Sequence, residues 1–293
     1  MGSLAADAAL LLVALIWGTT FVVVKVAVET VDPLAFVAAR FAVGSLAVAA
    51  LSWPRLRRAS AAAWRAGALL GVALFAGFAS QTIGLRESTP ARAAFITGLN
   101  VVLVPLFAAA LTGRRPGRAA WLGVAFSFAG MALLSAPLTA EGWSAGNWRG
   151  DALVLACAVA FALHIVGVGH VAGRHDAAAI TAVQLVAVAA LALLASGLGG
   201  ARPPLEASSW PAIAYMGLVA TGLVFLLQNW AQIHTSPTHT ALIFALEPVF
   251  AAFFSRLFYG EALTGRVAAG GLLIVAGMVV SELAGREPTP PTG

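Results

Sequence analysis

The chain alternates long apolar runs with short polar gaps. Ten runs reach the roughly 20 apolar residues that a helix needs to cross a bilayer. Several runs start at a proline, as in Asp32-Pro33 and Ser236-Pro237, where the missing N–H leaves no helical partner unsatisfied. The pattern therefore predicts ten transmembrane helices followed by a disordered tail over 286–293. The predicted spans are about 6–28, 33–53, 64–85, 90–111, 118–136, 150–172, 177–199, 209–232, 237–259 and 265–284.

The two halves of the chain resemble each other. An offset of 147 residues superimposes polar, proline and glycine positions, and near the first span an offset of 144 fits better. Each repeat, 1–140 and 150–285, holds five spans, and because five is odd the second repeat enters the membrane from the opposite side. Inverted repeats are typical of secondary transporters, whose substrate sites lie near the midplane between the repeats. The matched pairs include Gln81 and Gln228, Pro90 and Pro237, Asn100 and Glu247, and, at the shorter offset, Trp17 and Phe161.

Composition limits the solvent and the function class. Apolar residues make up 60% of the chain and charged residues 10%, against about 25% charged in soluble domains. A cytosolic enzyme, a disordered protein and a disulfide-stabilised secreted domain are therefore excluded. The net charge of +5 comes mainly from arginines in the gaps, which favours a role in topology over nucleic-acid binding. The clusters at 55–58 and 114–118 predict an inner-membrane protein with both termini in the cytoplasm.

Several stretches resemble the drug/metabolite transporter superfamily, specifically its EamA-type ten-helix exporters. They are 14–21, Arg40-Phe41 and 93–105 in the first half, and 228–250 with Gly260-Glu261 in the second. The resemblance covers nearly the whole chain. It implies ten helices in two five-helix repeats around a central cavity, with the fifth and tenth helices at the periphery. It also implies movement of small metabolites, often amino acids, out of the cytoplasm, in some members coupled to protons.

Polar side chains in the middle of spans are candidates for a functional site, because they are costly in lipid. Glu247 lies near the centre of the ninth span and is a candidate for proton coupling or for binding a substrate amine. Its repeat mate Asn100 lies at the centre of the fourth span. The amides of Gln81, Gln228 and Asn229 suit a cavity that binds a zwitterion, and the alternative is hydrogen bonding between helices.

Aromatic and basic residues complete the candidate site. Trp17 lies near mid-span, where the usual interfacial role of tryptophan does not apply, and Phe78 and Phe244 could line the same partly apolar cavity. His164 could contact substrate or bond a neighbouring helix. Two cations in the outer parts of spans have further alternatives. Arg40 could bind a substrate carboxylate or face protein. Lys25 could pair with Glu29 four residues on or snorkel to the outer interface.

We interpret the chain as a secondary transporter that exports small metabolites, with amino acids expected first, by alternating access. The alternatives are a membrane-embedded lipid-modifying enzyme and a channel or facilitator. No phosphate-binding loop or HExxH motif is present, and we expect no catalytic residue, metal site or cofactor. The expected partners are a small-molecule substrate, H⁺ and the lipid bilayer. Glycines recur every seven residues in the fifth and tenth spans, which favours packing within a monomer over a dimer face.

Overall fold

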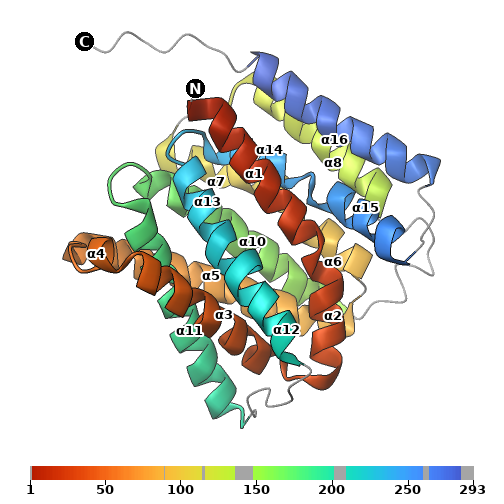
Figure 1. Cartoon of the computed structure of the whole chain (residues 1–293). Coiled ribbons are helices and arrows are strands. Elements are labelled where there is room, and N and C mark those ends of the chain that lie inside the picture. The colour runs from red at the N-terminus through yellow and green to blue at the C-terminus, as the bar shows by residue number, and fades with distance from the viewer. Residues whose placement is uncertain are drawn as a thin grey trace, which may run out of the picture.

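All secondary structure that the computed structural model describes is helical (Figure 1). The described residues are 2–88, 90–113, 116–135, 148–200, 209–259 and 264–284, so the predicted tail lies outside them. The first half contains α1 (Gly2–Gly18), α2 (Thr20–Thr30), α3 (Pro33–Leu51), α4 (Trp53–Leu56), α5 (Ala61–Glu87), α6 (Pro90–Thr97), α7 (Asn100–Thr112) and α8 (Arg118–Ser135). The second half contains α10 (Trp148–Val171), α11 (Ala177–Leu198), α12 (Trp210–Ala214), the π-helix η2 (Tyr215–Leu223), α13 (Val224–Ala231), α14 (Pro237–Phe244), α15 (Glu247–Tyr259) and α16 (Gly265–Ala284).

The predicted spans coincide in position with these helices, and several spans consist of more than one helix. Within the part of the chain that the structure describes, seven helical stretches are long and apolar enough to cross a membrane, and an eighth follows if the bent pair Leu4–Gly18 and Val23–Thr30 forms one span. Two more apolar helices, Arg118–Leu134 and Gly265–Ser281, are shorter. The structure confirms an all-helical membrane fold, and the count of ten crossings remains a prediction.

Side-chain caps start equivalent helices in the two halves. The Asp32 carboxylate accepts the backbone N–H groups of Leu34 and Ala35 at the start of α3, at 2.9 and 3.0 Å. The Asp176 carboxylate accepts the N–H of Ala179 at the start of α11, at 2.9 Å. Such caps satisfy N–H groups that have no partner within the helix. Because the two aspartates are 144 residues apart, the shorter repeat offset extends through the second and seventh spans.

Helix packing follows the same repeat. Helices α3 and α11, and helices α8 and α16, each pack against their own repeat mates. The pair α5 and α10 has its counterpart in α13 and α1, and the pair α11 and α5 in α3 and η2. A twofold relation between the halves requires this pattern. The two counterparts are unequal in one case, because α5 contacts α10 far more extensively than α1 contacts α13.

Helices α8 and α16 lie side by side along one flank of the molecule (Figure 1). They meet through the glycines that recur every seven residues. A Cβ atom on Gly270 would lie 2.6 Å from the carbonyl oxygen of Gly130, and one on Gly130 would lie 2.5 Å from that of Gly270. Gly123 and Gly277 oppose each other in the same way. The glycine spacing therefore serves an interface within the chain, as the sequence favoured.

Two spans are interrupted at equivalent positions. A turn at 98–99 separates α6 from α7, and a turn at 245–246 separates α14 from α15. The offset of 147 relates the two turns, and it relates the residues that follow them, Asn100 and Glu247. The sequence predicted both spans as continuous, which is wrong at these turns. Interrupted helices at matched positions are a common feature of transporter binding sites.

Candidate substrate-binding cavity

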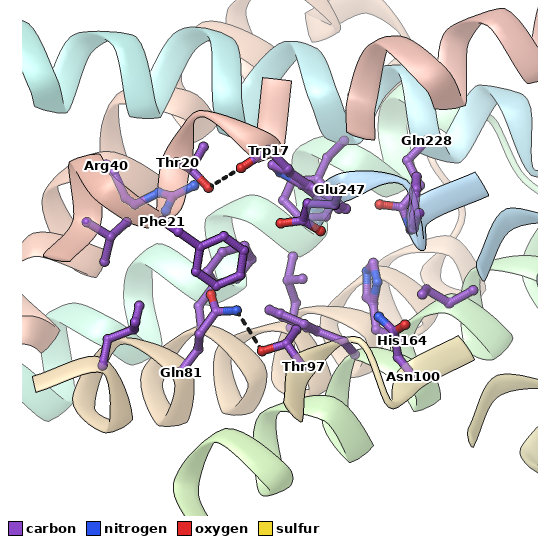
Figure 2. Close-up of a pocket in the computed structure, with 18 residues that line it drawn as sticks. Trp17, Thr20, Phe21, Arg40, Gln81, Thr97, Asn100, His164, Gln228 and Glu247 are labelled. Carbon is purple, nitrogen blue, oxygen red and sulfur yellow. Dashed lines mark hydrogen bonds between the residues drawn. The ribbon is translucent and has the colours of Figure 1, made fainter. Parts of the chain in front are cut away.

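A cavity lies between the two halves, where α6 meets α7 and α14 meets α15 (Figure 2). It leaves about 40 Å³ for the centres of water molecules, enough for only a few of them. A metabolite therefore needs some separation of the surrounding side chains or helices. The lining residues are Trp17, Thr20, Phe21, Val24, Arg40, Leu74, Phe78, Gln81, Leu85, Thr97, Asn100, Phe161, His164, Ile165, Phe225, Gln228, Phe244 and Glu247.

Most of the lining residues are repeat mates of one another. Each half therefore contributes equivalent positions to the lining, as expected for a cavity at the pseudo-twofold axis that relates the halves. At the offset of 147 the lining pairs are Phe78 with Phe225, Gln81 with Gln228, Thr97 with Phe244 and Asn100 with Glu247. At the offset of 144 they are Trp17 with Phe161, Thr20 with His164 and Phe21 with Ile165.

Eight of the nine site residues predicted from the sequence line this cavity, and Asn229 does not. Asn229 instead donates a hydrogen bond to Thr181 in α11 at 2.7 Å. Its contact serves the packing of α13 on α11, the interhelical alternative for this amide. The eight that line the cavity are Trp17, Phe78, Gln81, Asn100, His164, Gln228, Phe244 and Glu247.

Glu247 and Asn100 face the cavity from the first turns of α15 and α7 (Figure 2). Among the described residues, neither side chain has a hydrogen bond or ion pair. A carboxylate and an amide at this depth are costly without partners. Their polar atoms are therefore available to water or to a bound molecule, which is what a binding site requires.

The other polar lining residues are partly engaged. Gln81 donates to Thr97 at 3.3 Å, within the first half of the chain. Gln228 donates to Gln232 at 3.0 Å, and its own amide oxygen is buried without a partner in the described structure. His164 bonds the Gln184 side chain at 2.8 Å. His164 therefore fulfils both interpretations, because it lines the cavity and also joins α10 to α11.

Aromatic rings form the apolar part of the wall. The Trp17 ring lies 5.0 Å from that of Phe244 and 5.8 Å from that of Phe225, measured between centroids. Phe78 lies 5.0 Å from Phe161 in an edge-to-face arrangement, a geometry that aromatic pairs prefer. Gly77 makes room for the Phe161 ring, since a Cβ at Gly77 would overlap it. The rings therefore hold one another in place around the cavity.

Some lining residues were missed by the sequence analysis. Phe225 is the repeat mate of Phe78, so extending the offset to every candidate would have found it. Thr20 is the mate of His164 at the shorter offset. Arg40 was considered with two alternatives, and its side chain lines the cavity. The sequence carries no local signal for the π-helix η2, which supplies the partners of Arg40.

Side-chain contacts join the two halves at the end of the molecule where α1 and α14 begin. There the His239 ring approaches the Asp7 carboxylate at 3.0 Å, joining the two halves. In the second half, Gln232 donates to the backbone carbonyl of Ile165 at 2.9 Å. The lining runs the other way, toward Val24 in α2 and the end of α5.

Lys25 lies near that opposite end of the cavity. Its ammonium group donates to the carbonyl oxygens of Leu85 and Ser88, at 2.8 and 3.3 Å. The pair with Glu29, one of the two alternatives from the sequence, is not formed, because the unpaired carbonyls at the end of α5 are stronger partners for the ammonium group than an exposed carboxylate. Lys25 thus ties α2 to α5 beside the cavity.

Comparison with known proteins identifies the family. The chain matches the model of the EamA-like transporter family twice, over residues 4–136 and 148–282. It belongs to the EamA-like transporter family. An uncharacterized transporter of Archaeoglobus fulgidus is 32% identical over 280 residues, which cover 95% of this chain and 86% of the relative. The uncharacterized inner membrane transporter YedA of Escherichia coli K12 is 27% identical over 85% of this chain and 81% of its own length.

Two further similarities have narrower scope. A probable terminal-alkyne amino-acid exporter of Streptantibioticus cattleyicolor is 34% identical over 100 residues, about a third of each protein. A solved structure titled only as a crystal structure of a protein matches with a TM-score of 0.78 and 24% identity, over 98% of this chain and 99% of that one. It supports the fold of this EamA-like transporter. Family membership makes the chain a multi-pass membrane transporter and not an enzyme.

Proposed function

We propose that this EamA-like transporter exports amino acids by alternating access. The observation that carries the proposal is one cavity lined by repeat mates from both halves, with a carboxylate and amides beside aromatic rings. Polar groups of this kind suit the ammonium and carboxylate of an amino acid, and the rings suit an apolar side chain. The partial similarity to a probable terminal-alkyne amino-acid exporter supports the same substrate class.

The proposed moving units are the repeats, 1–140 and 150–285. In this structure the Asp7–His239 contact joins them at the end where the chain begins. The arginine clusters support a cytoplasmic location for that end, so in this proposal the contact holds the cytoplasmic side closed. The opposite state would break this contact and admit substrate from the cytoplasm. The same charge asymmetry assigns both termini to the cytoplasmic face of the inner membrane.

Glu247 is the proposed proton-coupling residue. It faces the cavity without an ion-pair partner in the described structure, so proton binding and substrate binding would compete at one group. Transport should therefore vary with pH, and a neutral residue at 247 should remove that variation while downhill exchange continues at a lower substrate affinity.

The test uses the purified chain in liposomes with labelled proteinogenic amino acids. The wild type should show saturable flux that a pH gradient accelerates, and Glu247→Gln should lose the gradient effect. Glu29→Gln, an exposed carboxylate at the end of α2, is the matched control and should behave as wild type. Absence of flux for every amino acid would refute the proposed substrate class, and flux that never saturates would favour a channel.

A further inference from the structure

Arg40 occupies an unusual position for a cation. Its side chain is buried, with a relative exposure of 2%, in α3 within a predicted membrane span, and it lines the central cavity (Figure 2). The guanidinium lies 4.9 Å from the ring centroid of Phe78 and 5.4 Å from that of Phe41. These rings favour a cation by their quadrupoles, and they fix the plane of the group.

The π-helix η2 supplies the hydrogen-bond acceptors for one side of the guanidinium. The Thr221 hydroxyl accepts from Nε at 3.2 Å and from Nη2 at 2.9 Å, and the Ala220 carbonyl accepts from Nη2 at 3.4 Å. The same carbonyl accepts the indole N–H of Trp17 at 3.3 Å. Neutral acceptors thus position Arg40 without neutralising it.

The remaining nitrogen, Nη1, has no acceptor among the described residues, and no carboxylate of those residues lies within 4.0 Å of the guanidinium. Arginine carries five N–H donors and keeps its charge in proteins. A charge buried at membrane depth is expensive and is normally paired. Arg40, which lines the cavity, therefore has a positive charge and an Nη1 donor that are available to a bound anion.

A group of opposite charge lies in the same cavity but does not pair with Arg40. Glu247 also lines it and also lacks an ion pair in the described structure. The repeat shows how the two charges arise. Arg40 corresponds to the neutral Gln184 at the offset of 144, and Glu247 corresponds to the neutral Asn100 at the offset of 147. Each half thus contributes one charge where its mate contributes an amide.

We propose that Arg40 binds the carboxylate of the substrate while Glu247 binds its ammonium group. The inference rests on the proposed transport of amino acids and goes further, because it makes the free carboxylate a requirement. The two charges would orient a zwitterion across the boundary between the halves, with the aromatic wall beside its side chain. A dianionic phosphate is disfavoured, because Glu247 would repel it.

The first arm of the test changes the ligand and leaves the protein intact. Thermal stabilisation and competition for flux are measured with the proteinogenic L-amino acids, their carboxamides, and the amines that lack the carboxylate. The proposal expects amino acids to bind about ten-fold or more tightly than the matching amides, which is the usual size for a lost charged hydrogen bond. Equal binding of acids, amides and amines would overturn it while leaving amino-acid transport standing.

The second arm changes the protein. Arg40→Met should abolish the preference for the acid over the amide, and Arg40→Lys should keep part of it, since lysine retains the charge but not the planar fork. Thr221→Val keeps the shape of the threonine and removes the hydroxyl acceptor, so the preference should shrink even if Arg40→Met does not fold. Arg86→Gln, at an exposed position at the end of α5, is the control and should change nothing.

The outcomes separate the two proposals. An unchanged acid-over-amide preference in a folded Arg40→Met or Thr221→Val protein would refute the role of Arg40. A wild type that neither binds nor moves any amino acid would refute the proposed function itself. Loss of the preference with retained binding of the amides would support both.

Discussion

Two adjacent glycines in α16 offer a sharp test of the helix packing. A Cβ on Gly270 would lie 2.6 Å from the carbonyl oxygen of Gly130 and 2.9 Å from the Cβ of Leu134. A Cβ on Gly271 would meet only the methyl groups of Val249, at 3.5 and 3.7 Å. The first site has no room for a methyl group, and the second gives it an ordinary contact. The substitutions Gly270→Ala and Gly271→Ala therefore differ in packing while sharing a helix and a chemistry.

The expected magnitudes follow from these distances. Both substitutions gain about 0.5–1 kcal/mol, because alanine is a better helix former than glycine. Gly270→Ala must in addition push two backbones apart, and overpacking of this kind costs about 1–3 kcal/mol. The two variants should thus differ by about 1–3 kcal/mol, with Gly271→Ala equal to or above wild type. At roughly 2–4 °C per kcal/mol for a chain of this size class, the melting temperatures should separate clearly.

Thermal unfolding in detergent, followed by tryptophan fluorescence, measures the difference. Gly130→Ala serves as the reciprocal variant, since its Cβ would lie 2.5 Å from the Gly270 carbonyl oxygen. It should destabilise as Gly270→Ala does, and the double variant should lose less than the sum, because one separation of the helices accommodates both methyl groups. Equal melting temperatures for Gly270→Ala and Gly271→Ala would show that α8 and α16 do not pack as described.

Two further predictions concern the ends of the cavity. Asp7→Ala should weaken the contact with His239 and shift the equilibrium toward the state open at that end by about 1 kcal/mol, or roughly five-fold. The measurement is the labelling rate of a cysteine placed at Gln232 in a Cys157→Ala background, which should increase. His239→Ala should act alike and non-additively, and additive effects would argue against a shared contact. Lys25→Met should destabilise the protein by about 1–2 kcal/mol, because the Leu85 and Ser88 carbonyls lose a charged donor, measured as a lower unfolding temperature. Glu29→Gln should leave that temperature unchanged, and a matching loss there would point to a Lys25–Glu29 pair.

The repeat offset carried most of what the sequence predicted about the site. It matched Asn100 with Glu247 and Gln81 with Gln228, and all four line the cavity. A symmetric fold places equivalent positions at equivalent depths, so one intramembrane polar residue locates its mate. The offset did not separate Asn229 from Gln228, because neighbouring residues on a helix face different directions.

Features set by tertiary packing escaped the sequence. Ala245 and Leu246 themselves favour helices. The local signal for the break is Pro248, which lacks the N–H that would bond the carbonyl of Phe244, where α14 ends. The π-helix η2 lacks a local signature, and its role is visible only through the bonds that Thr221 and Ala220 make with Arg40. Lys25 had an acceptable partner in Glu29 by spacing, but the end of α5, sixty residues away in the chain, provides its actual acceptors.

The unequal contacts of two equivalent helix pairs indicate which state of the transport cycle the protein occupies. The contacts of α3 with α11 and of α8 with α16 map onto themselves when the halves exchange roles, so they can persist throughout the cycle. The contact of α5 with α10 maps onto that of α13 with α1, and the first is much the larger here. In the opposite state the proportions should be reversed. The ratio of cross-linking rates between α5 and α10 and between α1 and α13 would therefore report the balance between the two states of the transporter.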